Sequence, residues 1–380
     1  MGLAIVSLTV ATAIVFDFTN GFHDTANAMA TTIATRALPP RAAVGLAACL
    51  NFAGAFISVA VAATIANGIV DQASVTVPII FAGLIGAILW NVITWFLGIP
   101  SSSSHALVGG MVGSVLAGVG SGAVIWSGIA SKVVIPAVLA PFVCGLAAFV
   151  ATRLSYRLTR PIDQGRSGVG FRFSQIGSSS MVALAHGTND AQKTMGVIVL
   201  TLVAGGRLSP TAGVPVWVKV VCATAIALGT FSGGWRVIKT LGTKVTEVES
   251  PQGFSAETSS ATAILSSSYF GFSLSTTQVV SGGVMGAGLG RAGGVVHWGV
   301  VRNMVFAWLL TMPAAGAMGA LAEVTVSGFS NATVGVAVVG AAAAAILATF
   351  LVQARRHGNV TADNVIEAEP QALQPAGVGA

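Results

Sequence analysis

Eleven apolar stretches follow one another along this chain, many of them about the length of a helix that crosses a membrane. Only 8% of the residues are charged and 54% are hydrophobic, which is far from the composition of a soluble domain. The stretches are also longer than the alternating segments of about ten residues that build a β-barrel. We therefore predict an all-α polytopic membrane protein. The stretches are 3–18, 42–66, 78–98, 106–120, 133–151, 176–205, 214–231, 260–272, 279–300, 304–322 and 331–352.

A basic segment at residues 152–173 divides the chain near its middle. It holds five arginines and a single carboxylate, Asp163. Positive charge beside membrane helices marks the cytoplasmic side, so this segment is predicted to be a cytoplasmic loop. The basic residues of the whole chain lie between apolar stretches and not on one soluble face, which argues against a nucleic-acid partner.

Two polar motifs occur twice, in the same order, on either side of the basic segment. Residues 20–24 align with 186–190 at an offset of 166, and residues 98–105 align with 271–278 at an offset of 173. The first half holds five apolar stretches, so the second half would enter the membrane with the opposite orientation. This pattern predicts two inverted-topology repeats with a substrate site near the middle of the membrane.

The Ser-rich members of these motifs predict breaks in membrane helices. Residues 100–104 read Pro-Ser-Ser-Ser-Ser, and irregular backbone at membrane depth is tolerated only where it lines a cavity or is buried in protein. Serine and threonine cap helix N-termini, and free N–H groups at such an end attract anions. Isolated hydroxyls that bond back to their own helix would be the plain structural alternative. Because the tract recurs in both halves, we favour an anion site.

Asp24 and Asp190 occupy equivalent positions in the two halves, within stretches that have almost no other charge. Carboxylates inside membrane segments commonly mark proton relays or cation sites. An ion pair with Lys193, three residues further on, is an alternative for Asp190. Position 27 is an asparagine, so that alternative does not extend to Asp24. Asp17 shares the helical face of Asp24 but has no acidic counterpart in the second half, and we rank it as secondary.

Three histidines lie inside the motifs: His23, His105 and His186. Imidazole titrates near neutral pH and suits a proton relay, but a neutral imidazole hydrogen-bonded to the nearby hydroxyls is an equal alternative. A ligand held by hydroxyls, amides and aspartates should be a small oxyanion that itself carries a proton. Monohydrogen phosphate can donate to a carboxylate and sulfate cannot, so the residues favour phosphate.

Segments 20–28, 100–105 and 186–193 resemble the duplicated motifs of the inorganic phosphate transporter (PiT) family, and the likeness extends from residue 1 to about residue 353. The resemblance implies a secondary phosphate transporter with inverted repeats, driven by a proton or sodium gradient, and often dimeric. The short central loop is similar to that of the bacterial low-affinity type. His23 stands where many sodium-coupled members have Asn, which inclines the interpretation toward protons, with carriage of a neutral metal–phosphate complex as an extension.

The resemblance and the residues together predict a set of functional side chains. Substrate binding is assigned to Asn27, Ser102, Ser103, Ser104, Asn189, Lys193, Ser275, Thr276 and Thr277. Cation or proton coupling is assigned to Asp24, Asp190, His23, His105 and His186, with Na⁺ or a metal–phosphate complex at the two aspartates as the alternative.

The predicted architecture has about ten to twelve membrane segments, some of them broken or re-entrant. Its parts are a first repeat (1–151), the basic loop (152–173), a second repeat (174–325), an appended helix (326–353) and a disordered tail (354–380).

We predict a multi-pass protein of a bacterial plasma membrane that imports inorganic phosphate with H⁺. Its partners would be phosphate, the lipid bilayer and a second copy in a homodimer, with no cofactor other than the coupling ion. The alternatives are a Na⁺-coupled phosphate symporter, a sulfate permease on the same fold and a passive anion channel. An enzyme is not expected, since the chain has neither a nucleophile-elbow motif nor a Walker motif.

Overall fold

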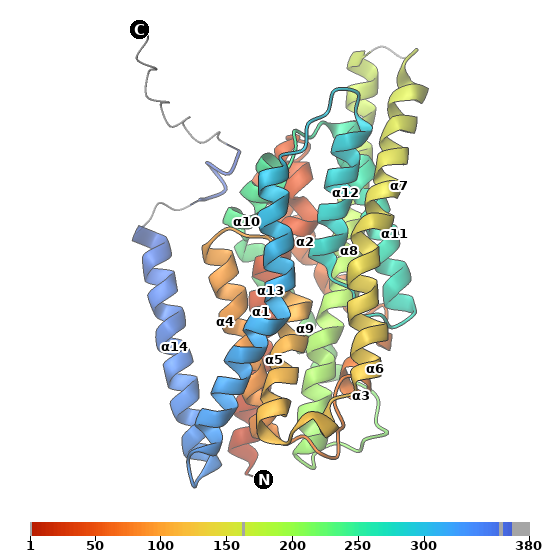
Figure 1. Cartoon of the computed structure of the whole chain (residues 1–380). Coiled ribbons are helices and arrows are strands. Elements are labelled where there is room, and N and C mark those ends of the chain that lie inside the picture. The colour runs from red at the N-terminus through yellow and green to blue at the C-terminus, as the bar shows by residue number, and fades with distance from the viewer. Residues whose placement is uncertain (1, 162–163, 357–359, 367–380) are drawn as a thin grey trace.

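Helices account for nearly all regular structure in this computed structural model, which describes residues 2–161, 164–356 and 360–366 (Figure 1). The first half contains α1 (Leu3–Ala34), α2 (Pro40–Gly54), α3 (Ala60–Gly68), α4 (Val77–Phe96), α5 (Ser103–Gly118), α6 (Trp126–Ile129) and α7 (Ile135–Thr159). The second half contains α8 (Gln164–Ala204), α9 (Val216–Ser232), α10 (Trp235–Lys239), α11 (Ser250–Tyr269), α12 (Thr276–Gly290), α13 (Trp298–Ser327) and α14 (Ala332–Arg356). The all-α membrane fold is therefore confirmed.

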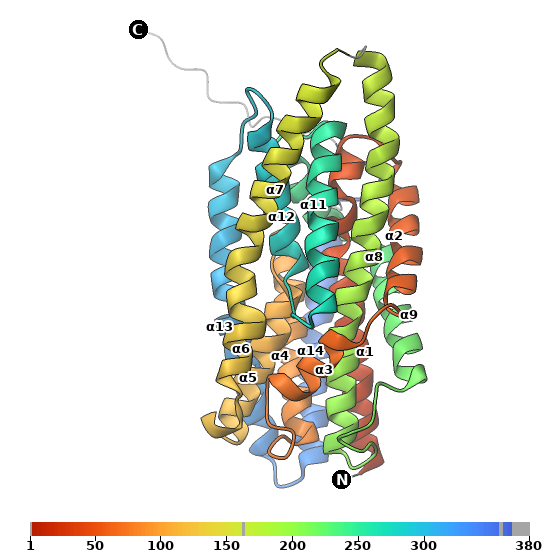
Figure 2. The same cartoon turned by 90° about the vertical axis from the view of Figure 1, so that its right-hand side faces the viewer.

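Two long helices, α1 and α8, carry the two copies of the His/Asn–Asp motif side by side through the molecule (Figures 1 and 2). The chain enters α1 at the end marked N, which we call the lower end, and runs upward. It then returns downward along α8, so the motifs lie on antiparallel helices. This arrangement is compatible with the predicted inverted repeat.

Two helical hairpins approach the motifs from opposite ends. Helices α4 and α5 lie in the lower half of both views, and α11 and α12 lie in the upper half. The turns that join them, 97–102 and 270–275, contain the two Ser-rich tracts. The predicted helix breaks at 100–104 and near 273–277 are therefore present, and the tips of both hairpins lie inside the protein.

Fewer helices are complete membrane spans than the apolar stretches suggest. Within the described residues five segments are long and apolar enough to cross a membrane: α1, α4, Trp126–Thr159, α13 and α14. A sixth, Val216–Lys244, qualifies if the 62° bend between α9 and α10 lies within one span. The stretch predicted at 42–66 is two helices, α2 and α3, because the chain turns at 55–59. No proline marks this break in the sequence.

The basic segment predicted as a loop at 152–173 is mostly helical, and this part of the prediction was wrong. Helix α7 continues to Thr159 and α8 begins at Gln164, so both extend past the rest of the bundle at the upper end (Figure 2). Arginine is a good helix former, and a charged helix can continue into water beyond the membrane. Its cytoplasmic side stays a prediction.

The tail is only partly described. Helix α14 extends to Arg356, and the turns at 360–366 place Val365 in a buried position against one of the hydrophobic clusters. For 360–366 the expectation of disorder is therefore wrong. Residues 357–359 and 367–380 lie outside the described residues.

Glycines let helices of one half touch helices of the other. A Cβ on Gly113 of α5 would lie 1.9 Å from the backbone oxygen of Gly316 on α13. A Cβ on the equivalent Gly286 of α12 would lie 1.9 Å from the oxygen of Gly145 on α7. Gly109 and Gly113 of α5, and Gly282 and Gly286 of α12, are spaced four residues apart and are thus contact points between helices, as in other membrane proteins. The same type of contact occurs between α5 and α13 and between α12 and α7, which again fits a repeat.

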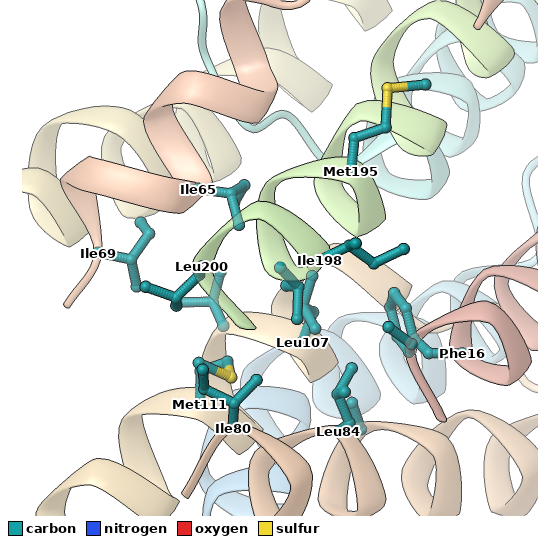
Figure 3. Packing of buried hydrophobic residues seen from close by; sticks show 14 of the residues in the cluster. Phe16, Ile65, Ile69, Ile80, Leu84, Leu107, Met111, Met195, Ile198 and Leu200 are labelled. Carbon is teal, nitrogen blue, oxygen red and sulfur yellow. The ribbon is translucent and has the colours of Figure 1, made fainter. Parts of the chain in front are cut away.

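An apolar layer closes the interior below the motifs. Side chains from α1, α3, α4, α5 and α8 pack together there, including Phe16, Leu84, Leu107, Met111 and Ile198 (Figure 3). Each of these five side chains is at most 4% exposed. A route from the polar motifs to the lower end is therefore shut in this conformation.

We expect Gly113→Ala to destabilise the protein strongly. The added methyl group would overlap the Gly316 backbone, so α5 and α13 would have to separate, with a loss of about 3 kcal/mol, at the upper end of typical overpacking effects. Heating detergent-solubilised variants and measuring the remaining monodisperse protein by size exclusion would show it. Gly299→Ala is the matched control, because nothing lies within 4 Å of its added Cβ. Equal midpoints for the two variants would contradict the proposed helix contact.

Candidate substrate and coupling site

The two motif aspartates meet across the α1–α8 contact. Asp24 and Asp190, at most 1% exposed, form a group with His186 in which one ligand atom from each residue lies within 4.8 Å of the others. His186 Nε2 is 3.5 Å from Asp190 Oδ2 and 4.0 Å from Asp24 Oδ2. Two carboxylates and an imidazole, contributed by both halves, thus surround one point in the interior.

Lys193 sits at the centre of the second motif. Its ammonium donates to Asp190 Oδ1 at 2.7 Å, to the Leu274 carbonyl at 2.9 Å and to the Ser104 hydroxyl. The lysine is fully buried, so its charge depends on these partners. The ion pair considered for Asp190 is present. Lys193 also connects both hairpins to α8.

Asp24 has a partner that the i+3 spacing rule did not reveal. The Nδ1 of the preceding residue, His23, lies 2.6 Å from Asp24 Oδ1, and the Nε2 of the same ring lies 3.3 Å from the hydroxyls of Thr94 and Ser101. His23 therefore connects the carboxylate to the α4–α5 hairpin. Both readings of this histidine, as proton carrier and as neutral hydrogen-bonded ring, agree with these contacts.

The hairpin turns present capped helix N-termini to the cluster. Ser102 accepts a hydrogen bond from the backbone N–H of His105, and Ser275 accepts one from that of Gln278. These are N-caps at equivalent places in the two halves. The Ser103 hydroxyl is buried and has no hydrogen-bond partner among the described residues.

Helix α12 begins with hydroxyls directed at the aspartates. Thr277 Oγ1 lies 3.4 Å from Asp24 Oδ1, and Thr276 Oγ1 lies 3.5 Å from Asp190 Oδ2. Asn27 donates to Thr276 at 3.3 Å and to Thr277 at 3.0 Å. One hairpin tip therefore contacts the motifs of both long helices.

The amides of the motifs keep free acceptors. Asn189 donates to Ser268 at 2.8 Å and to the Phe272 carbonyl at 3.4 Å, both on the α11–α12 hairpin. Its Oδ1 and that of Asn27 accept no hydrogen bond from any described residue, although both side chains are buried. Buried polar atoms without partners are uncommon. A ligand with hydroxyl groups, or a cation, would satisfy them.

His105, a predicted site residue, makes no hydrogen bond to either aspartate among the described residues. It lines an apolar groove of about 670 Å³ between α7, α12 and α13, together with Gln278. Its Nε2 has no hydrogen-bond partner in the described structure.

Several contributing residues were missed by the sequence analysis. Asn51 of α2 lies 3.1 Å from His186 Nδ1 and donates to Thr230 of α9. Gln192, inside the second motif, accepts from the backbone N–H groups of residues 61 and 62 and so caps α3. An amide side chain within the apolar stretch 42–66 was the signal that could have identified Asn51.

Another buried carboxylate, that of Glu257 on α11, lies among hydroxyls. It accepts from Thr31 at 2.6 Å, Thr32 at 2.9 Å and Ser178 at 2.6 Å, and from the Gln175 amide at 3.2 Å. These contacts join α1, α8 and α11 above the aspartate cluster. No run of neighbouring motif residues marked this glutamate in the sequence.

Comparison with known proteins places the chain among transporters. The model of the phosphate transporter family matches residues 20–169 and 162–319. A probable low-affinity inorganic phosphate transporter of Mycobacterium bovis is 54% identical over 365 residues, covering 95% of this chain and 88% of that protein. One from Mycobacterium leprae is 53% identical and covers 91% of this chain and 84% of that protein.

A solved structure shares the fold. It is titled the sodium-dependent phosphate transporter, is 26% identical, has a TM-score of 0.76 and covers 86% of this chain and all of that one. With the family model matching most of the chain and bacterial relatives of the same description, this multi-pass membrane protein belongs to the phosphate transporter family, which its duplicated motifs resembled.

Proposed function

We propose that this phosphate transporter is a symporter that imports inorganic phosphate together with H⁺ across the cell membrane. The observation that best supports this proposal is the buried group of Asp24, His186 and Asp190, which is built from both halves. Two carboxylates and two imidazoles adjoin a buried ammonium here, so a proton changes the charge of the site without a large rearrangement.

Phosphate would bind between the long helices and the two hairpin tips. Lys193 supplies positive charge, and the Ser103 hydroxyl and the amides of Asn27 and Asn189 supply further polar groups. The N-termini of α5 and α12 add free N–H groups. A hydroxyl of monohydrogen phosphate can donate to Asp24 Oδ2, which accepts no hydrogen bond from the protein.

The nitrogen ligand favours a proton over sodium. Hard cations such as Na⁺ are held by oxygen atoms, whereas imidazole binds protons or transition metals. His186 stands between the aspartates at 3.5 and 4.0 Å, where a sodium site would place oxygen. The same mixed ligand set suits a metal ion carried as a metal–phosphate complex. The sodium dependence named for the structural neighbour supports Na⁺ as the second candidate.

We also propose that the repeats 1–151 and 174–325 alternate access around this site. The lower route is closed by the apolar layer, whereas a cavity of about 930 Å³ lies at the other end, lined by Thr35, Arg36, Arg160 and Arg291 among others. The cavity ends short of the aspartates. Rocking of one repeat against the other is the usual way such folds expose a central site.

Purified protein in liposomes tests the coupling directly. We expect labelled phosphate to accumulate when only a pH gradient, acidic outside, is imposed, and not when only a Na⁺ gradient is imposed. Accumulation that needs Na⁺ and ignores pH would replace H⁺ by Na⁺. Uptake that runs only down the phosphate gradient, without either ion, would indicate a passive channel.

Competition and assembly experiments complete the assignment. Excess sulfate should leave phosphate uptake nearly unchanged, because sulfate cannot donate to an aspartate. Strong inhibition by sulfate would favour the sulfate permease. The proposed homodimer is tested by cross-linking the protein in liposomes at low protein-to-lipid ratio.

A further inference from the structure

Asp17 is a buried carboxylate that the proposed substrate site does not use. It is 0% exposed, and among the described residues neither of its oxygens has a hydrogen-bond partner. Its polar neighbours are the Thr194 hydroxyl of α8 and the Cys222 thiol of α9, and the nearest charges are those of Asp190 and Lys193. Burying a charged carboxylate without a partner in an apolar interior costs much free energy, so the charge of Asp17 must be neutralised.

Asp17 is on the same face of α1 as the motif aspartate. Positions 17, 20 and 24 follow the three- and four-residue spacing of one helical face. Seven residues of helix correspond to about 10 Å of rise, so Asp17 lies two turns below Asp24. Asn20, between them, is fully buried, and both polar atoms of its amide lack a hydrogen-bond partner in the described part of the chain.

Asn91 brings a second amide to the same level. Helices α1 and α4 contact each other where His23 Nε2 meets the Thr94 hydroxyl at 3.3 Å. Both helices run upward to this point, so Asn20 and Asn91, three residues earlier on each, lie one turn lower on the facing sides. Asn91 is 1% exposed, and its amide too has no hydrogen-bond partner within the described ranges.

The unpartnered groups form a polar column with one closed end. Above, it joins the His23–Asp24 pair of the substrate site. Below, the apolar layer begins at Phe16, the neighbour of Asp17 in the chain (Figure 3). Asn20 and Asn91 each offer a free donor and acceptor, which is what a bridging water requires. Asp17 thus stands at the boundary between the column and the apolar layer.

We propose that Asp17 is a proton-holding residue that loads the transporter from the lower end. When the apolar layer opens, the Asp17 carboxylate takes a proton from the medium. After it closes, that proton passes along waters held by Asn20 and Asn91 to Asp24, beside His23, and Asp17 is left ready to be reloaded at the next opening. This inference rests on H⁺ coupling as the proposed function.

Asp17→Asn separates proton loading from substrate binding. In liposomes with an imposed pH gradient, net phosphate uptake should fall at least about 10-fold. Exchange of labelled phosphate between equal pools on both sides should stay within about 2-fold of wild type, because exchange needs no net proton movement and the binding residues are intact.

Two further variants keep the test decisive. Asp17→Glu should retain net uptake and shift its pH dependence, since it keeps a protonatable group. Glu323→Gln removes another buried carboxylate, on α13, that lies outside the column and should leave net uptake unchanged. If Asp17→Asn does not fold, an unshifted pH profile in Asp17→Glu overturns the inference.

The outcomes distinguish the two proposals. Wild-type protein that ignores the pH gradient overturns H⁺ coupling itself. Wild-type protein driven by the gradient, together with Asp17→Asn that takes up phosphate equally well, overturns only the role of Asp17. Loss of exchange along with net uptake in folded Asp17→Asn also overturns it, because that would place Asp17 in substrate binding.

Discussion

Replacing Asp190 by asparagine should lower gradient-driven phosphate uptake at least about 100-fold, equivalent to about 2.7 kcal/mol or more. The amide keeps the size of the carboxylate but cannot take up a proton, and it offers Lys193 no negative charge in place of the contact at 2.7 Å. The neighbouring His186 also loses the carboxylate at 3.5 Å. Uptake into proteoliposomes under a pH gradient, normalised to the amount of folded protein, measures the effect.

The matched control for Asp190→Asn is Glu247→Gln, which removes an exposed carboxylate before α11. It should transport like wild type. Asp190→Asn with wild-type uptake would remove the aspartate from the coupling site, whatever its contacts in the structure.

Lys193→Met should weaken phosphate binding at least about 10-fold, since a charge-assisted hydrogen bond contributes about 1.5–3 kcal/mol. It should also destabilise the fold by about 3–5 kcal/mol, because Asp190 would be left as a buried charge without its counter-ion. Equilibrium binding of labelled phosphate to the solubilised protein, together with its thermal midpoint, measures both effects.

The double variant Asp190→Asn/Lys193→Met separates the two effects of Lys193. Removing both charges should recover most of the lost stability, since a buried pair replaced as a unit is often neutral. Transport should stay absent in the double variant. Recovery of transport would mean that the pair only holds the fold together, and that phosphate is bound elsewhere.

Much of the architecture was readable from the sequence because the chain repeats itself. Equivalent motifs on halves of opposite orientation are expected to meet near the middle of the membrane, and the proximity of Asp24 and Asp190 is compatible with that arrangement. The two Ser-rich tracts predicted helix breaks because serine caps and exposed backbone act locally. Ser102 and Ser275 indeed cap α5 and α12.

What the sequence did not reveal depends on contacts between distant segments. Hydropathy treats 42–66 as one stretch, and the break before α3 is fixed by Gln192, more than a hundred residues away. Glu257 is held by hydroxyls from α1 and α8, which no local spacing announces. His105 belongs to a motif, yet the turn of α5 carries its ring into the apolar groove.

The hydrogen bonds between α1 and α12 also impose an order on biosynthesis. Asp24 and Asn27 are made about 250 residues before Thr276 and Thr277, their partners on the second hairpin. Until then the first helix holds Asp24 without the Thr277 hydroxyl and Asn27 without either of the hydroxyls that accept from it. Such a helix is expensive to hold in lipid. A chain that ends after the first half therefore leaves these polar side chains of α1 without their partners from α12.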